Sequence, residues 1–182
     1  MISSLKNPVT EKDHHIGSLH ALVVLVEYGD FECPHSSSFS PIVDQLINEF
    51  KSNICYVYRH FPLSNIRPHA LLAALASEAA DQQHEFWNFS EFLFKNYDYL
   101  SPELMDECAE GLNLNLHQFR KDMKSENLLE RITKDFSGGV RSGVHSTPTI
   151  FLNDHRYDGP LTYESLRDAI QRMIDEGQAT YI

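Results

Sequence analysis

The sequence predicts an α/β fold built from two strand-and-helix halves that flank an all-helical insertion. Two runs, 21–26 and 54–59, are rich in aliphatic, β-branched or aromatic residues, which is typical of buried strands. Between them, apolar residues recur at helical spacing over 34–51. Because a helix connects the two strands, we expect them to lie parallel in one sheet, joined by a right-handed crossover.

The segment after the second strand predicts helices only. The stretch 67–99 is rich in alanine and leucine at first and in aromatic residues later, which indicates two helices. Shorter helical patterns follow at 101–110, 116–124 and 126–140. We therefore expect an all-helical insertion between the two halves of the sheet.

Strand character returns near the C-terminus. The run 147–152 predicts a strand, and 155–159 is a candidate for a short returning strand. Thr162 can cap a final amphipathic helix that ends before Gly177. The predicted organisation is an N-terminal arm at 1–20, a first half at 21–64, the insertion at 65–145 and a second half at 146–182.

Composition and charge exclude several classes of function. The chain of 182 residues has a formal net charge of −11, which argues against binding to nucleic acids or to anionic membrane surfaces. The longest apolar run, 21–26, is too short to span a bilayer, and 1–15 lacks the apolar stretch of a secretory signal. We expect a cytoplasmic protein, or a periplasmic one if a signal peptide was removed. The sequence leaves the oligomeric state open.

Cys33 is the candidate nucleophile because it lies where the first strand ends and the next helix begins. A thiol at a helix N-terminus faces unpaired backbone N–H groups and the positive end of the helix dipole, which both favour the nucleophilic thiolate. We expect the Cys33 sulfur to be exposed and to be a thiolate at neutral pH. Ser36 stands three residues later, where a dithiol redox motif has its second cysteine.

Five short motifs, in this order, carry a resemblance to a known family. The chain resembles the DsbA-like thiol–disulfide oxidoreductases, which have a thioredoxin-like fold with a helical insertion. The similarity extends from about residue 20 to the last helix. The motifs are EYGDFECPH at 27–35, RHFPL at 59–63, RPHA at 67–70, FW at 86–87 and STPTIFLN at 146–153.

The resemblance implies roles for the residues around Cys33. It implies that Cys33 is the nucleophile and that Pro34 and His35 form the dipeptide that makes its thiol acidic. It places Ser36 at the position of the resolving cysteine. Glu27 corresponds to an acid buried beneath the site, where desolvation would raise its pKa for proton exchange with sulfur. The alternative is that Glu27 points to solvent near the end of its strand.

Other residues are expected beside a bound substrate. Pro148 corresponds to the cis-proline of the family, and Thr147 before it would pair with a peptide in a strand-like manner. The alternative for Pro148 is a trans proline that begins a strand. His60 and His69 either border the substrate surface or are polar loop residues.

The serine at position 36 restricts the expected chemistry to that of one thiol. A single thiol can attack a disulfide, but an external thiol must release the mixed disulfide that forms. We therefore expect exchange with protein thiols or disulfides, or disulfide isomerisation, with glutathione as a candidate co-substrate and no other cofactor. Two alternatives remain open, which are a non-catalytic binding or regulatory module of the same fold and an engineered Cys-to-Ser variant that traps mixed disulfides.

The remaining cysteines and the N-terminal histidines predict structural or solvated roles. Cys55 lies in a predicted core strand and Cys108 in the insertion, so we expect neither to resolve the Cys33 bond. His14, His15 and His20 lie in the predicted arm, and a metal role would need further ligands that the fold brings to them. The sequence by itself predicts no metal site.

Overall fold

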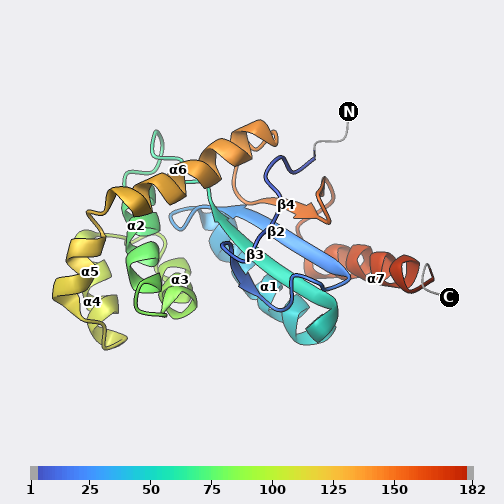
Figure 1. Ribbon diagram of the computed structural model, residues 1–182, viewed down its shortest axis with the longest axis horizontal. Coiled ribbons are helices and arrows are strands. Elements are labelled where there is room, and N and C mark those ends of the chain that lie inside the picture. The colour runs from blue at the N-terminus through green and yellow to red at the C-terminus, as the bar shows by residue number, and fades with distance from the viewer. Residues whose placement is uncertain (1–3, 180–182) are drawn as a thin grey trace.

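A five-stranded mixed sheet forms the centre of the protein (Figure 1). The computed structural model describes residues 4–179. The strands are β1 (His14–Ile16), β2 (Val23–Gly29), β3 (Ile54–His60), β4 (Thr149–Leu152) and β5 (His155–Arg156). Their order in the sheet is β1-β3-β2-β4-β5. β2 and β3 are parallel, as predicted, and the other neighbouring strands are antiparallel.

The helices follow the order that the sequence predicts. Two of them belong to the strand-and-helix halves, and the others lie between β3 and β4, within the predicted insertion. A short 3₁₀ turn, Lys51–Asn53, leads into β3. The helices are α1 (Pro34–Phe50), α2 (Ala70–Asp81), α3 (Phe86–Lys95), α4 (Pro102–Gly111), α5 (Leu116–Asp122), α6 (Glu126–Arg141) and α7 (Tyr163–Ala179).

The sheet is buried on both faces, as the continuous apolar runs of β2 and β3 predict. On one face, Leu25 packs in a cluster with Leu46 of α1 and Ile170 of α7. On the other face, Val26 belongs to a second cluster against which Phe136 of α6 packs. Because consecutive strand residues point to opposite faces, each central strand contributes to both apolar layers.

The insertion forms a block at one end of the sheet. Figure 1 shows α2 to α5 gathered there, and α6 running from this block back over the sheet. Side-chain caps begin two of these helices, since Ser101 Oγ accepts the N–H of Leu104 at 3.1 Å and Asn115 Oδ1 accepts the N–H of Gln118 at 3.0 Å. Among residues 4–179, no helix combines the length and the apolar composition that crossing a membrane requires.

Two predictions about the ends of the chain differ from the structure. The predicted loose arm at 1–20 contains β1, which pairs with β3 at the edge of the sheet. Gly17 follows β1 with a φ of +97°, and a Cβ there would lie 2.7 Å from the carbonyl oxygen of Ile54, so only glycine suits this exit from the sheet. At the other end, α7 continues through Gly177, because a glycine weakens a helix without necessarily ending it.

The core of the insertion gives a test of the packing. Phe89 of α3 is fully buried and its ring centroid lies 5.5 Å from that of Phe119 in α5. We expect Phe89→Ala to lower the free energy of unfolding by about 3–5 kcal/mol, because it removes a large buried ring and leaves a cavity. Urea unfolding measures this change. The control Tyr99→Ala, at a side chain 74% exposed, should change it by less than about 0.5 kcal/mol, and equal effects of the two variants would contradict the packing described.

Candidate active site

Cys33 caps the N-terminus of α1, as the sequence predicts. β2 ends at Gly29, and in the turn that follows the N–H of Cys33 donates to the carbonyl of Asp30 at 3.0 Å. The carbonyl of Cys33 accepts the N–H of Ser37 at 2.9 Å. Pro34 begins the helix, where a backbone N–H would have no partner within the helix. The backbone therefore holds the sulfur at the positive end of the helix.

The Cys33 side chain is fully buried, so the expectation of an exposed sulfur is wrong. Its Sγ donates a hydrogen bond to the carbonyl oxygen of Thr147 at 3.2 Å. The physical reason is that the loop before β4 packs against the start of α1 and covers the thiol. The thiol is therefore covered in the structure, and this loop must move before a disulfide can reach the sulfur.

The loop that covers the thiol also borders a groove. The peptide bond between Thr147 and Pro148 is cis. Thr147 is buried, and its Oγ1 has no hydrogen-bond partner among the described residues. The groove has a volume of about 350 Å³, and its lining combines aliphatic and aromatic side chains with one imidazole. Its lining residues are His35, Ser38, Phe39, Ile42, Thr147, Pro148 and Leu161.

Asp30 fixes the turn that carries Cys33, a role that the sequence analysis missed. Its carboxylate is buried and accepts the N–H groups of Glu32 and Leu63, both at 2.9 Å, and Arg67 Nη1 at 3.4 Å. Burial raises the pKa of Asp30 above its ordinary value, although the two backbone donors oppose this shift. An aspartate directly after a buried strand is the signal that could have identified this residue.

Ser36 and His35 occupy different surroundings, although they are neighbours in the motif. Ser36 is fully buried, and its Oγ accepts the N–H of Asp30 at 3.4 Å. His35 is exposed and lines the groove beside Thr147. The Ser36 hydroxyl is therefore enclosed beside the turn before α1, whereas the His35 imidazole faces the groove.

Glu27 is buried in β2, which confirms the predicted burial of this residue. Its Oε2 accepts the hydroxyl of Tyr56 at 2.7 Å, and its Oε1 has no partner among the described residues. Burial raises the pKa of Glu27 to about 8, although the bond from Tyr56 opposes the shift. A Cβ on Gly29 would lie 2.9 Å from Glu27 Oε1 and 2.4 Å from the Tyr58 ring, so glycine leaves room for both. The proton-exchange role of Glu27 stays a prediction.

The other two cysteines are buried free thiols, which fits the expected structural roles. Burial raises the pKa of Cys55 to about 11. It raises the pKa of Cys108 to about 12. Both thiols are therefore protonated at neutral pH and are poor nucleophiles.

Two histidines have other surroundings than the sequence suggested, and a third, His69, is a polar loop residue, one of its two predicted alternatives. His14, predicted in a solvated arm, is buried in β1, and His60, predicted beside the substrate or in a loop, is buried at the end of β3. Both contact Glu78 of α2. His69 Nδ1 lies 3.2 Å from Glu32 Oε1, so it joins the segment before α2 to the turn before Cys33. Sequence reasoning could not pair these groups because the fold brings them from distant segments.

The raised pKa of Glu27 predicts a specific dependence of stability on pH. Folded Glu27 keeps its proton up to a pH of about 8, whereas an ordinary glutamic acid ionises near 4.5. The native state therefore binds the extra proton between these values, and the free energy of unfolding falls as pH rises through this range, by on the order of 1 kcal/mol per pH unit. The stabilisation linked to the proton on Glu27 is fully present below pH 4.5 and is lost by about pH 8.

Urea unfolding at several pH values between 5 and 8 tests this prediction. Glu27→Gln lacks the titrating group, so its stability should fall less steeply over this range than that of the unmodified protein. The exposed Glu110→Gln variant controls for the loss of one carboxylate. Parallel curves for Glu27→Gln and the unmodified protein would show that the buried carboxyl does not titrate as described.

Comparison with known proteins identifies the fold and the family of the chain. A family model described as thioredoxin matches residues 9–172. The oxidised form of BdbD from Bacillus subtilis superposes with a TM-score of 0.83 at 22% identity, covering 96% of this chain and 100% of that one. α-DsbA1 from Wolbachia pipientis superposes with a TM-score of 0.85 at 21% identity, covering 98% of both chains. These structural matches show a DsbA-like fold.

Closer sequence similarity comes from part of a longer protein. The Na⁺/H⁺ antiporter NhaA 1 of Salinispora arenicola is 39% identical over 160 residues, which are 88% of this chain and 24% of the antiporter. NhaA 3 of Salinispora tropica is 38% identical over the same shares of the two chains. The chain thus spans about a quarter of the length of these relatives. Because the thioredoxin model matches nearly the whole chain, the chain belongs to the thioredoxin family.

Proposed function

We propose that the protein is a thiol–disulfide oxidoreductase that works through one thiol, that of Cys33, and forms mixed disulfides with protein or glutathione thiols. The observation that carries this proposal is the pair of contacts at the start of α1. Cys33 is the N-cap residue with its Sγ against the Thr147 carbonyl, and the buried Ser36 Oγ, three residues later, accepts the N–H of Asp30.

The reaction proceeds by two exchanges at sulfur. The Cys33 thiolate attacks a substrate disulfide and forms a bond to one of its two sulfur atoms. The other sulfur leaves as a thiolate and takes up a proton equivalent to the one that the Cys33 thiol lost. A second thiol, from glutathione or a protein, then attacks the mixed disulfide. This step forms a new disulfide on the substrate and returns Cys33 to the thiol. The two electrons pass between substrate and external thiol, because Ser36 cannot form a disulfide.

The groove beside Cys33 supports protein substrates. Its aliphatic and aromatic lining suits apolar side chains of a peptide, and Thr147 offers a backbone edge beside the sulfur. One structural neighbour, α-DsbA2 from Wolbachia pipientis, is described as a thiol-disulfide exchange protein. A cytoplasmic location, where thiols stay reduced, would supply the external thiol that this chemistry needs.

The complete burial of Cys33 favours a second function. A binding or regulatory module could use the same groove without turnover, with its thiol kept covered. The rate at which native Cys33 reacts with a small alkylating reagent separates the two functions. Reaction at a rate close to that of the unfolded chain supports the oxidoreductase, and protection until global unfolding supports the binding module.

Restoring a second thiol tests the assignment of the site. We expect Ser36→Cys to convert the protein into a dithiol enzyme, because the new thiol lies in the same turn as Cys33 and can release a bound substrate. The assay follows oxidation of a model dithiol peptide by the oxidised variant, with no glutathione present. The unmodified protein should show no turnover in this assay.

Two variants serve as controls for that experiment. Gln45→Cys adds a thiol to the same helix at an exposed position more than three turns beyond Cys33 and outside the groove, so it should not restore turnover. Cys33→Ala combined with Ser36→Cys should also be inactive. Turnover that survives the loss of Cys33, or an inactive Ser36→Cys variant that is folded, would argue against the proposed site.

A further inference from the structure

A buried cluster of two histidines and one glutamate lies apart from the Cys33 site. His14 of β1, His60 of β3 and Glu78 of α2 are each less than 9% exposed. The Nε2 atoms of His14 and His60 lie 2.8 Å and 2.9 Å from Glu78 Oε1. All three potential ligand atoms are within 4.8 Å of one another. The fold therefore supplies the further ligands that the sequence alone could not assign to His14.

The rings that carry these ligand atoms are held in place by their neighbours. The His14 ring stacks on Phe86 with a centroid distance of 3.4 Å and an interplanar angle of 10°. On its other nitrogen, His14 Nδ1 lies 3.7 Å from Asp81 Oδ1. That distance is too long for a hydrogen bond, so Asp81 places a negative charge near the ring, and the stacking on Phe86 is what orients it.

The Glu78 carboxylate accepts hydrogen bonds through one oxygen, and its other oxygen has no partner among the described residues. Oε1 accepts from both histidines and from Arg131 Nε, which lies 2.6 Å away. Oε2 is buried and has no hydrogen-bond partner among the described residues. A buried carboxylate oxygen without a partner is costly and needs an explanation, of which an ion is one.

We propose that His14, His60 and Glu78 bind a divalent transition metal, with Zn²⁺ as the best match. Two imidazoles and one carboxylate are a ligand set that zinc accepts, with metal–ligand distances of about 2.0–2.2 Å. Ligand atoms around a tetrahedral zinc are then roughly 3.3 Å apart. The observed separations of 2.8 Å and 2.9 Å to Glu78 Oε1 are shorter than this, so the carboxylate must turn to admit an ion.

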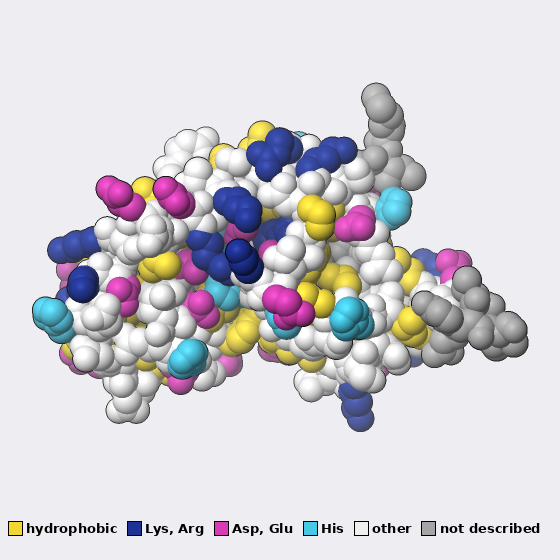
Figure 2. Space-filling view, viewed as in Figure 1, with side chains coloured by type: hydrophobic (Ala, Val, Ile, Leu, Met, Phe, Trp, Pro, Cys, Tyr) yellow, Lys and Arg dark blue, Asp and Glu magenta, His cyan; other side chains and the backbone are white. Residues whose placement is uncertain are grey.

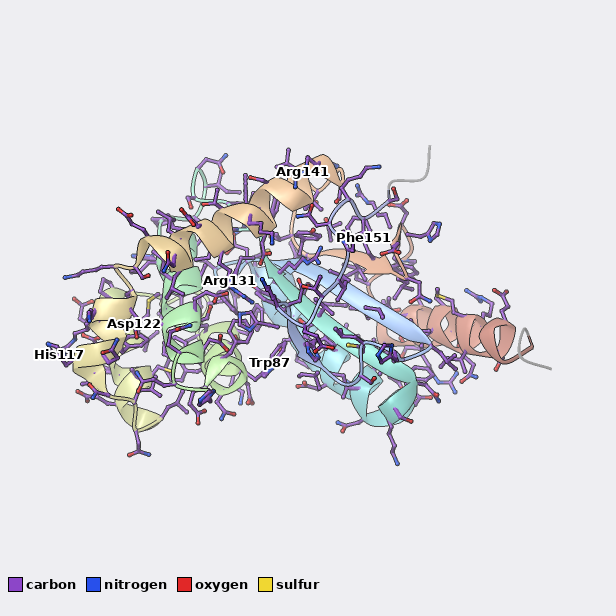
Figure 3. All side chains as sticks on the ribbon, in the orientation of Figure 1. Trp87, His117, Asp122, Arg131, Arg141 and Phe151 are labelled. Carbon is purple, nitrogen blue, oxygen red and sulfur yellow. The ribbon has the colours of Figure 1, made fainter. Side chains whose placement is uncertain are left out.

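Arg131 remains compatible with this site because Glu78 has two oxygens. Rotation of the carboxylate presents Oε2 to the metal and leaves Oε1 for Arg131, so the guanidinium supports the ligand from outside. Figure 3 shows Arg131 of α6 and Trp87 of α3 at the boundary between the insertion helices and the sheet. The site thus lies where these two parts of the fold meet.

Arg131 also separates the cluster from an open hollow. The Arg131 side chain is 30% exposed and lines a cavity of about 670 Å³ beside the N-terminal segment. Figure 2 shows Lys and Arg side chains gathered around this part of the surface. Acidic residues, among them Asp13 and Asp135, share the lining. Movement of the partly exposed Arg131 side chain would open a path for the ion from this cavity to Glu78.

A bound metal would join three segments of the fold. β1, β3 and α2 each contribute one ligand, so the ion would tie the N-terminal segment and the sheet to the insertion. We therefore infer that a bound ion would stabilise the folded protein. The fourth position on the metal remains for water.

Calorimetric titration with Zn²⁺ tests this proposal. The protein used is Cys33→Ala, which removes the active-site thiol as a competing ligand. We expect one Zn²⁺ per chain, and affinity at least about tenfold weaker in Glu78→Gln and in His14→Asn. The matched control is His15→Asn, because His15 is the next residue on β1 and lies outside the cluster, so it should bind like the parent. Far-UV circular dichroism without metal checks that each variant is folded.

Two further readouts separate this site from other zinc ligands. Co²⁺ in place of Zn²⁺ should give the visible bands of a low-coordinate nitrogen and oxygen site without the near-ultraviolet bands of thiolate ligation. A hundredfold excess of Zn²⁺ over Kd should raise the Tm of the parent by about 5–10 °C and that of Glu78→Gln by much less. Absence of stoichiometric binding, or equal affinity in the parent, Glu78→Gln and His14→Asn, would overturn the proposal.

Discussion

The buried carboxylate of Asp30 is the contact on which the candidate active site depends. It joins the turn before α1, through the N–H of Glu32, to the loop after β3, through Leu63, and to the segment before α2, through Arg67. A buried carboxylate without such donors would be costly, so these segments hold one another in place. The N–H of Cys33 donates to the carbonyl of the same residue. The position of the thiol therefore follows from the contacts of Asp30.

The contact between Cys33 and the loop before β4 bears on how a substrate would reach the thiol. In the structure the thiol is covered and donates to the carbonyl oxygen of Thr147. A peptide that pairs in a strand-like manner with this backbone would compete for that carbonyl and would displace the loop contact. In the proposed function, binding of a substrate is thus coupled to exposure of the sulfur. The hydroxyl of Ser36 accepts the N–H of Asp30, so it lies against the same turn.

The fold and part of the site follow from local sequence patterns. The strand before Cys33, the helix after it and the burial of Glu27 were predictable because apolar periodicity and a lone acid in an apolar strand are local signals. The burial of the Cys33 sulfur was not predictable, because the loop that covers it comes from a segment more than a hundred residues later in the chain. The contacts of His14 and His60 with Glu78 likewise join segments that are distant in the sequence, and no local sequence pattern predicts such contacts.

The identity of the reacting group is tested most directly by intact-mass spectrometry of the unmodified protein after incubation with a peptide disulfide. The account predicts one adduct per chain, located at Cys33 by peptide mapping, that persists until glutathione is added and is then released. Persistence follows because Ser36 cannot displace the bound peptide. An adduct on Cys55 or Cys108, release without any added thiol, or no adduct with the folded protein would contradict the account.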